Sequence, residues 1–482
     1  QQLIGRKECA VAALRKYNVE TKHIARWECF SALKTRKERK TARIFHRQNA
    51  IIFIVYVLGI SVVYLKNPSN FTVILAGAQL CYLVIVLGIF PIIYSNISRA
   101  VLSNMCMLLS IGFIMLARLN FETSVRQFII VAVVTMASLI VPFLMSKFQL
   151  WKYLTWVYCF VGIAALIAVL FLGDEDYGAK LAIEIGNFKF QPSEFVKIIF
   201  VFFLAGYLAE HNKFKDVCIS AVLAAIYVLI LVASTDLGSA LIFFMIYLFM
   251  LFVSTRNIIY LFLGAGGLSG ASVIAYHLFS HVQERFIAWR DPWSVIDNAG
   301  YQVAQSLFAI GSGGFMGTGL YEGSPKYIPV VTEDFIFSAI AEEFGGLFAM
   351  LLILVCFSCF IAFLKIAMEQ ANMFNKLVCV GLGVGYAVQV FLTIGGALKM
   401  IPSTGVTLPL VSSGGSSILS TLFVFAIMQG LAIVGTKVKR NVTRRIPTEG
   451  LVNEQRQTER IRQLERTGEI GKVGKKKKKK IK

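Results

Sequence analysis

The segment 280–333 holds the densest set of side chains that could do chemistry. Its basic residues Arg285 and Arg290 stand close to the acidic residues Asp291 and Asp297, and a glycine-rich stretch follows at 311–319. An arginine can bind a pyrophosphate through two hydrogen bonds, and a nearby carboxylate can act as general base for a hydroxyl group. Glycines let backbone N–H groups approach an anion closely. The spacing alone equally allows a folded plug whose charges pair among themselves.

A second set of charges lies inside apolar stretches, where each charge needs a partner or a function. Glu194 and Lys197, in QPSEFVKI, are three residues apart, so they share a helix face and can neutralise each other. Asp236 stands at the break between two short helices, a position that favours an acid. Glu342 and Glu343 lie within the tenth predicted helix. For each of these acids, a structural pair or cap and a substrate contact remain open.

The third set is the segment IPSTGVTLPLVSSGGSS at 401–417. Its prolines and its pair of glycines interrupt an apolar stretch, and broken helices at membrane depth are tolerated where they line a cavity. Ser412, Ser413 and Ser416 could supply hydrogen bonds to such a cavity. A transporter would show the same feature, so the segment is not specific for catalysis.

The elements that must position these residues are membrane helices. The sequence is 57% hydrophobic and only 16% charged, which is typical of membrane proteins. Apolar runs long enough to cross a bilayer predict an all-α polytopic protein. The expected helices are 49–66, 71–94, 99–117, 127–145, 151–172, 192–209, 217–233, 237–253, 258–279, 334–365, 375–396 and 406–436.

The charge distribution predicts the topology. Of the net charge of +21, residues 1–48 carry +9 and residues 437–482 carry +12. We therefore expect a basic cytoplasmic N-terminal arm (1–48), a transmembrane domain (49–436) and a basic cytoplasmic tail (437–482) in the inner membrane, with the loop 280–333 outside. The basic ends are expected either to contact anionic lipid or to be solvated tails, and nucleic acid is the weaker alternative for them. No spacing of cysteines or histidines predicts a metal site or a disulfide framework.

Taken together, the motifs allow a family to be recognised. The series QPSEFVKI, DLGSA, GYQVAQSLFAIGSGG, EDFIF, AEEFGG and IPSTGVTLPLVSSGGSS, in this order, resembles the SEDS family of FtsW, RodA and SpoVE proteins over about residues 187–436. The resemblance implies a bundle of about ten core transmembrane helices, to which about two N-terminal helices are added here. It implies a peptidoglycan glycosyltransferase that polymerises lipid II in cell division or cell-shape maintenance. It also implies a class B penicillin-binding protein as partner, divisome or elongasome proteins around it, and possible use of Mg²⁺ or Mn²⁺.

Two departures from the family pattern affect the expected site. The position of the family's catalytic aspartate is occupied by Val295, and EDFIF replaces the usual TDFIF while Asp334 is retained. We expect Asp297 to take the catalytic role, with Asp291 as the second choice. The residues expected to bind the substrate or shape its cavity are Arg285, Arg290, Glu194, Lys197, Asp334, Glu342, Glu343, Ser412, Ser413 and Ser416. The competing hypotheses are a lipid II flippase that uses the intramembrane charges, and a non-catalytic scaffold for a transpeptidase.

Overall fold

The computed structural model describes residues 19–94, 96–147, 150–176, 179–185, 188–211 and 213–436. The basic tail 437–482, and with it the lysine run expected to contact lipid, lies outside the described residues, as does the start of the N-terminal arm.

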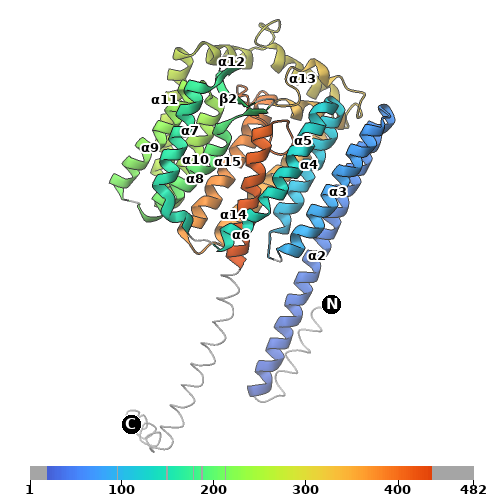
Figure 1. The fold of residues 1–482 in the computed structure, drawn as a ribbon, viewed down its shortest axis with the longest axis vertical. Coiled ribbons are helices and arrows are strands. Elements are labelled where there is room, and N and C mark those ends of the chain that lie inside the picture. The colour runs from blue at the N-terminus through green and yellow to red at the C-terminus, as the bar shows by residue number, and fades with distance from the viewer. Residues whose placement is uncertain are drawn as a thin grey trace, which may run out of the picture.

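Within these ranges, twelve helices are long and apolar enough to cross a membrane. Figure 1 shows them as a bundle, with α2 extending beyond it at one end. The helices that form the spans are α2 (Val19–Lys66), α3 (Asn70–Ile93), α4 (Arg99–Leu119), α5 and α6 (Phe121–Ser138 and Ile140–Lys147, one span), η1 and α7 (Leu150–Leu154 and Thr155–Leu172), α8 (Pro192–Glu210), α9 (Phe214–Ala233), α10 (Leu237–Thr255), α11 (Ile259–Leu278), α14 (Ile336–Met368), α15 (Met373–Ala397) and a last helix, Gly415–Thr436. The predicted number and order of spans are confirmed.

Three predicted boundaries were wrong. The last helix begins at Gly415 and not at residue 406, because the segment 401–414 forms turns and extended backbone around its two prolines. The fourth span begins at Phe121 rather than 127, since the Asn120 side chain accepts a hydrogen bond from the Thr123 N–H and caps the helix. The first helix begins well before residue 49 and includes a long polar stretch.

The segment 280–333, predicted as a loop, contains folded elements of its own. These are α12 (Ser280–Arg290), α13 (Tyr301–Gly313) and the short 3₁₀ helix η2 (Pro325–Tyr327). They lie across one end of the bundle (Figure 1), which we call the loop end.

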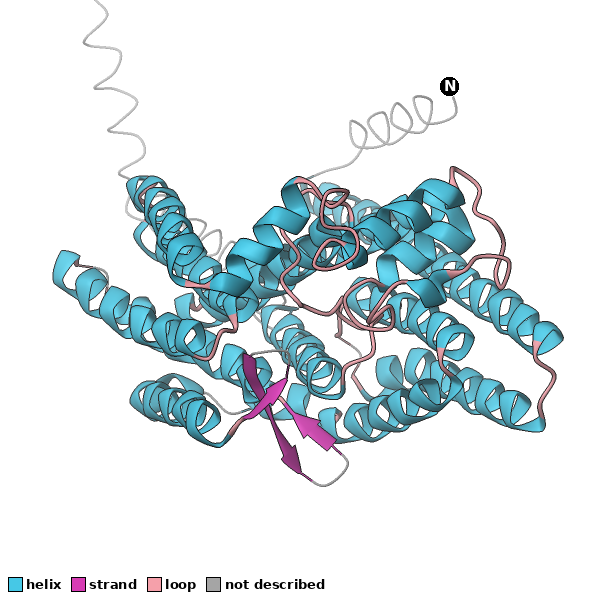
Figure 2. Cartoon of the chain, turned by 90° about the horizontal axis from the view of Figure 1, so that it is seen from above, coloured by secondary structure: helices cyan, strands magenta, loops and turns pink. Residues whose placement is uncertain are grey.

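The connection between α7 and α8 is not irregular either. It forms a three-stranded antiparallel sheet of β1 (Asp174–Asp176), β2 (Ala179–Ile185) and β3 (Phe188–Phe190), in the order β1-β2-β3. Figure 2 shows these strands beside the helix ends.

The core of the bundle is formed by α4, α8, α15 and the last helix. The buried share is 89% for the span of α4, 72% for α8, 78% for α15 and 83% for the last helix, whereas it is zero for α11. The polar residues of α8, α15 and the last helix are therefore held among packed neighbours, and α11 lies at the edge.

The two N-terminal helices are attached to this core by polar contacts. Gln48 of α2 donates to Asn104 of α4 (2.9 Å), and Asn104 donates to Ser358 of α14 (2.8 Å). Farther along, the Tyr56 hydroxyl donates to Gln79 of α3 (2.8 Å). Hydrogen bonds of this kind join helices in a membrane, where apolar contacts alone do not distinguish a neighbouring helix from lipid.

A close crossing of two backbones fixes the glycine-rich stretch against α14. The helix is interrupted at Gly345 (φ +86°), and the Gly346 N–H there donates to the Gly314 carbonyl (2.9 Å). A Cβ on Gly345 would lie 2.3 Å from the backbone nitrogen of Gly317, which itself has φ +85°. Only glycine fits at either position.

We predict that Gly345→Ala lowers the melting temperature of the purified protein in detergent. The free energy of unfolding should fall by more than the roughly 1–3 kcal/mol that a side chain in this backbone conformation costs by itself. The added methyl group would clash with the crossing backbone. Gly311→Ala is the matched control, because a Cβ there meets nothing within 4 Å. Equal melting temperatures for the two variants would show that the crossing is not fixed by Gly345.

Candidate functional site

A buried polar network lies below the loop end, where α8, α15 and the last helix meet. The Lys197 ammonium group donates to the Glu194 carboxylate (3.0 Å) and to the Gln389 side-chain oxygen (2.8 Å). The Ser420 hydroxyl donates to the same Glu194 oxygen (2.8 Å). The ion pair predicted from the spacing of Glu194 and Lys197 is therefore present, and both of its charges have further partners.

Asp236 joins this region to α10. One of its carboxylate oxygens accepts from the Ser239 N–H (3.0 Å), which makes Asp236 the N-cap of α10, and the other accepts from the Ser193 hydroxyl (3.3 Å). Of the two interpretations left open by the sequence, the structure shows the cap.

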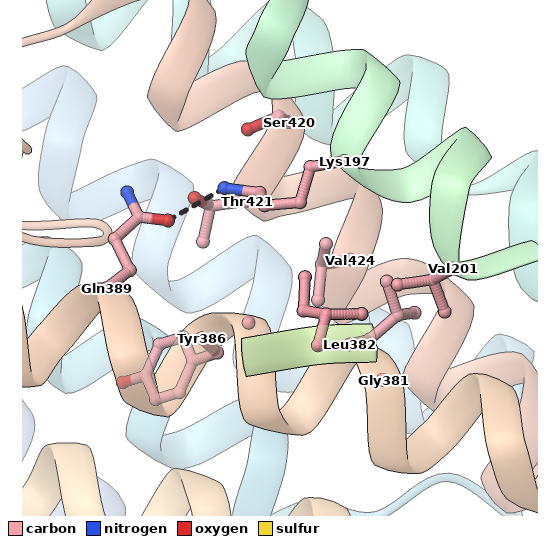
Figure 3. A pocket seen from close by; sticks show the side chains of 11 residues that line it. Lys197, Val201, Gly381, Leu382, Tyr386, Gln389, Ser420, Thr421 and Val424 are labelled. Atoms are coloured by element: carbon pink, nitrogen blue, oxygen red, sulfur yellow. Dashed lines mark hydrogen bonds between the residues drawn. The ribbon is translucent and has the colours of Figure 1, made fainter. Parts of the chain in front are cut away.

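A small cavity lies next to the network (Figure 3). Lys197, Tyr386, Gln389, Ser420 and Thr421 provide its polar lining, and the space open to a water-sized molecule is about 10 Å³, room for about one water. No sugar or phosphate group fits there.

The serines of the segment 401–417 hold backbone segments together rather than lining this cavity. The Ser412 hydroxyl donates to the Glu333 carbonyl, and Ser413 donates to the Thr332 carbonyl through both its N–H (2.7 Å) and its hydroxyl (3.0 Å). Ser416 accepts from the Gln191 N–H (2.9 Å). The first two contacts fasten the segment to the residues just before α14.

The carboxylates of Glu342 and Glu343 also bind other residues of the protein. Glu343 forms an ion pair with Arg118 at the end of α4 (2.9 Å), and Glu342 accepts from the Ser324 N–H (2.8 Å). The Arg118 guanidinium lies over the Tyr321 ring, 4.1 Å from its centroid. Sequence reasoning missed Arg118, although a charged residue at the end of an apolar helix was a signal for it.

We predict that Arg118→Leu destabilises the protein by about 3–5 kcal/mol, because it leaves the buried Glu343 carboxylate without its counter-charge. The double variant Arg118→Leu/Glu343→Leu should regain most of that loss. Both are measured by thermal unfolding in detergent. Lys66→Ala is the control, since it breaks the exposed ion pair of Lys66 with Glu322 (2.5 Å) and should leave the melting temperature unchanged. A double variant no more stable than the single one would contradict this account of the pair.

The two loop aspartates differ in what they do. The Asp291 carboxylate accepts from the N–H groups of Trp293 (3.2 Å) and Ser294 (3.4 Å), so it stabilises the turn after α12. Asp297 is exposed, and within the described ranges its carboxylate makes no hydrogen bond or ion pair. Val295, between them, is partly buried, and its carbonyl accepts from the Gly300 N–H (2.9 Å). Arg290 is exposed at the end of α12.

The basic residue Arg285 of α12 and the acidic residue Asp334 lie close together where α12 crosses the segment 401–414. Arg285 is exposed and donates to the Ser403 carbonyl (3.3 Å). Asp334 is half-buried beside it, and both side chains face Gly405: a methyl group on that glycine would lie 3.7 Å from an Asp334 oxygen and 3.8 Å from an Arg285 nitrogen. Burial, with a smaller contribution from the neighbouring Glu333, raises the pKa of Asp334 to about 6, although Arg285 acts in the opposite direction.

Comparisons with known proteins show the family of this chain. Residues 94–436 match the model of the FtsW, RodA and SpoVE family, described as cell cycle protein. The peptidoglycan glycosyltransferase RodA of Mycobacterium tuberculosis is 34% identical over 287 residues, 56% of this chain and 60% of that protein, so the chain spans about 60% of that relative's length. RodA of Mycobacterium leprae is 30% identical over 416 residues, 78% of this chain and 87% of that protein.

A solved structure, "Structural coordination of polymerization and crosslinking by a peptidoglycan synthase complex", contains a chain with the same fold. Its TM-score is 0.60 at 23% identity, and the likeness covers 71% of this chain and 98% of that one. The helices α2 and α3 precede residue 94, so ten of the twelve spans lie in the matched part of the chain.

The helical spans and the folded loop end define a multi-pass membrane protein. Since the family model matches most of the chain, the protein belongs to the SEDS family of FtsW, RodA and SpoVE.

Proposed function

We propose that the protein is a peptidoglycan glycosyltransferase that polymerises lipid II with its loop end at the outer face of the cytoplasmic membrane. The observation that carries this proposal is the exposed Arg285 beside the half-buried Asp334. A cation that can bind a pyrophosphate thus lies beside a carboxylate that can accept the proton of a hydroxyl group, at the loop end of the bundle. The relatives named above as peptidoglycan glycosyltransferases support the same activity.

In the proposed reaction, the 4-hydroxyl group of one lipid II attacks the anomeric carbon of the growing strand. The bond from that carbon to the pyrophosphate breaks, and the lipid pyrophosphate leaves. Arg285, with Arg290 on the same short helix, is placed to stabilise the negative charge of the leaving group. The base is one of the carboxylates at the loop end, with Asp297 and Asp291 predicted from the sequence.

The other two hypotheses are less well supported. A flippase would need a route past the charges of α8, but Glu194 and Lys197 pair with each other and with Ser420 and Gln389, and the adjoining cavity holds about one water. A non-catalytic scaffold is favoured by Val295 alone. It remains the second candidate because that position lacks the carboxylate of the family pattern.

A divalent cation would have to be bound largely by the pyrophosphate. Among the described residues, no group of three or more His, Cys, Asp or Glu side chains could hold a metal ion. Magnesium often binds in this manner, with one or two carboxylates and the phosphates of the substrate. No step of the proposed reaction depends on it.

We further propose a class B penicillin-binding protein as the partner that crosslinks the product, in a complex of the divisome or the elongasome. The matched fold in a peptidoglycan synthase complex supports this partner. The basic arm and tail are proposed to lie at the cytoplasmic surface against anionic lipid.

The test is polymerisation of fluorescent lipid II by the purified full-length protein with Mg²⁺, with and without its transpeptidase. We expect polymer from the wild type and a rate lower by about 100-fold for Arg285→Gln, because the leaving pyrophosphate loses a charged donor. Arg256→Gln is the matched control, since that exposed arginine follows α10 at the other end of the bundle and should not affect the rate. No polymer from the wild type under any condition, but polymer from Val295→Asp, would establish the scaffold instead.

A further inference from the structure

The family's aspartate position is occupied by Val295, and this raises the question of which carboxylate removes the proton from the attacking hydroxyl group. We propose that Asp334 is this general base and that the open space beside Gly405 receives the hydroxyl group. The inference rests on the proposed polymerase activity and assigns its proton acceptor to the start of α14 instead of the loop after α12.

Geometry is the first support for this assignment. The position of a methyl group on Gly405 marks a point 3.7 Å from an Asp334 carboxylate oxygen and 3.8 Å from an Arg285 guanidinium nitrogen. Because residue 405 is a glycine, that point is free of side-chain atoms, and the residue is exposed. A hydroxyl group that enters this space and moves closer to the carboxylate would have a proton acceptor and a cation as neighbours, a pair that acid–base catalysis of group transfer can use.

Rigidity is the second support. The bonds from Ser412 and Ser413 fasten the segment 401–414 to Glu333 and Thr332, next to Asp334. From the other side, the Trp289 indole donates to the Lys399 carbonyl (3.1 Å), and Arg285 to the Ser403 carbonyl. The two functional side chains are thus held on backbone that is fixed from both directions, and a fixed geometry is what preorganises a catalytic pair.

The loop aspartates are less suitable. Asp291 is engaged by two backbone N–H groups of its own turn. Asp297 is exposed on a turn and, in the part of the chain that the structure describes, no basic side chain pairs with it. The Asp334 carboxylate accepts no hydrogen bond from described residues and is not within 4.0 Å of a basic group. It is half-buried, near a cation, and still available to a ligand.

The electrostatics agree with the assignment. A general base works best with a pKa near the pH of the reaction, and burial raises the pKa of Asp334 to about 6. The charged groups that affect it are Glu333, which raises the pKa, and Arg285, which lowers it. Above pH 6 the carboxylate is ionised and can accept a proton; below that pH it is protonated and cannot.

The oxygen of the acceptor hydroxyl group forms a bond to the anomeric carbon, and its proton passes to the Asp334 carboxylate. The bond between the anomeric carbon and the pyrophosphate oxygen breaks, and its electron pair leaves with the pyrophosphate beside Arg285. Asp334 then releases the proton to water.

The first test compares Asp334→Asn, Asp291→Asn and Asp297→Asn in the lipid II polymerisation assay. Loss of a general base typically costs 10²–10⁴-fold, so we expect the rate of Asp334→Asn to fall by at least about 100-fold. The other two variants should lose much less activity than Asp334→Asn does. Thermal unfolding in detergent checks that the nearly isosteric Asn variant is folded.

The pH dependence of the rate separates a base from a merely structural residue. We expect the wild-type rate to decline below pH 6 or so, in line with the pKa of Asp334. In Arg285→Gln the loss of a positive charge should raise that pKa, so the decline should begin at a higher pH. A rate independent of pH in this range would overturn the assignment.

The space beside Gly405 is tested by Gly405→Ala, which places a methyl group between Asp334 and Arg285. Gly314→Ala is the matched control, because Gly314 also has positive φ (+54° against +72°) but a Cβ there meets nothing within 4 Å. Both variants place a side chain on backbone with positive φ. Only Gly405→Ala should lower the polymerisation rate, by at least about tenfold. Equal rates would overturn the proposed position of the hydroxyl group.

The outcomes distinguish this inference from the proposed function. Polymer from the wild type that disappears in Asp297→Asn or Asp291→Asn but persists in Asp334→Asn would leave a polymerase with a loop base and reject Asp334. The absence of polymer from every form of the protein except Val295→Asp would reject both proposals together.

Discussion

The requirement to neutralise charge within an apolar bundle is the constraint on which the rest of this structure depends. Glu194 and Lys197 satisfy it by pairing with each other and by recruiting Gln389 and Ser420 from two other helices. Leaving either charge unpaired would cost several kcal/mol. The pair therefore fixes how α8, α15 and the last helix pack, and these helices carry the segments that reach the loop end.

The same principle separates the polar residues of the loop end into two groups. Glu342, Glu343 and Asp236 are bound to backbone or side-chain partners and serve as caps and fasteners. Arg285 and Asp334 both lie next to Gly405 without forming an ion pair with each other. Residues of the first group give the site its shape, and those of the second can act on a ligand.

Much of this fold could be predicted from the sequence because each membrane helix corresponds to a long apolar run of residues. The number and order of the spans followed from those runs, as did the Glu194–Lys197 pair from its three-residue spacing. The break at Gly345 and the engagement of Ser412 by the Glu333 carbonyl could not be foreseen, since they depend on which backbone crosses nearby. Arg118 was missed because its partner is 225 residues away in the chain.

The hairpin of α2 and α3 has a consequence for assembly in the membrane plane. It packs along α4 through hydrogen bonds that include Gln48 and Asn104, and its turn reaches the loop end through Lys66 and Glu322. That flank of α4 is thereby removed from the perimeter that lipids and other membrane proteins can touch. A transmembrane segment of any companion protein must dock elsewhere on the circumference or on the hairpin itself, so the added helices restrict the directions from which a larger complex can be built.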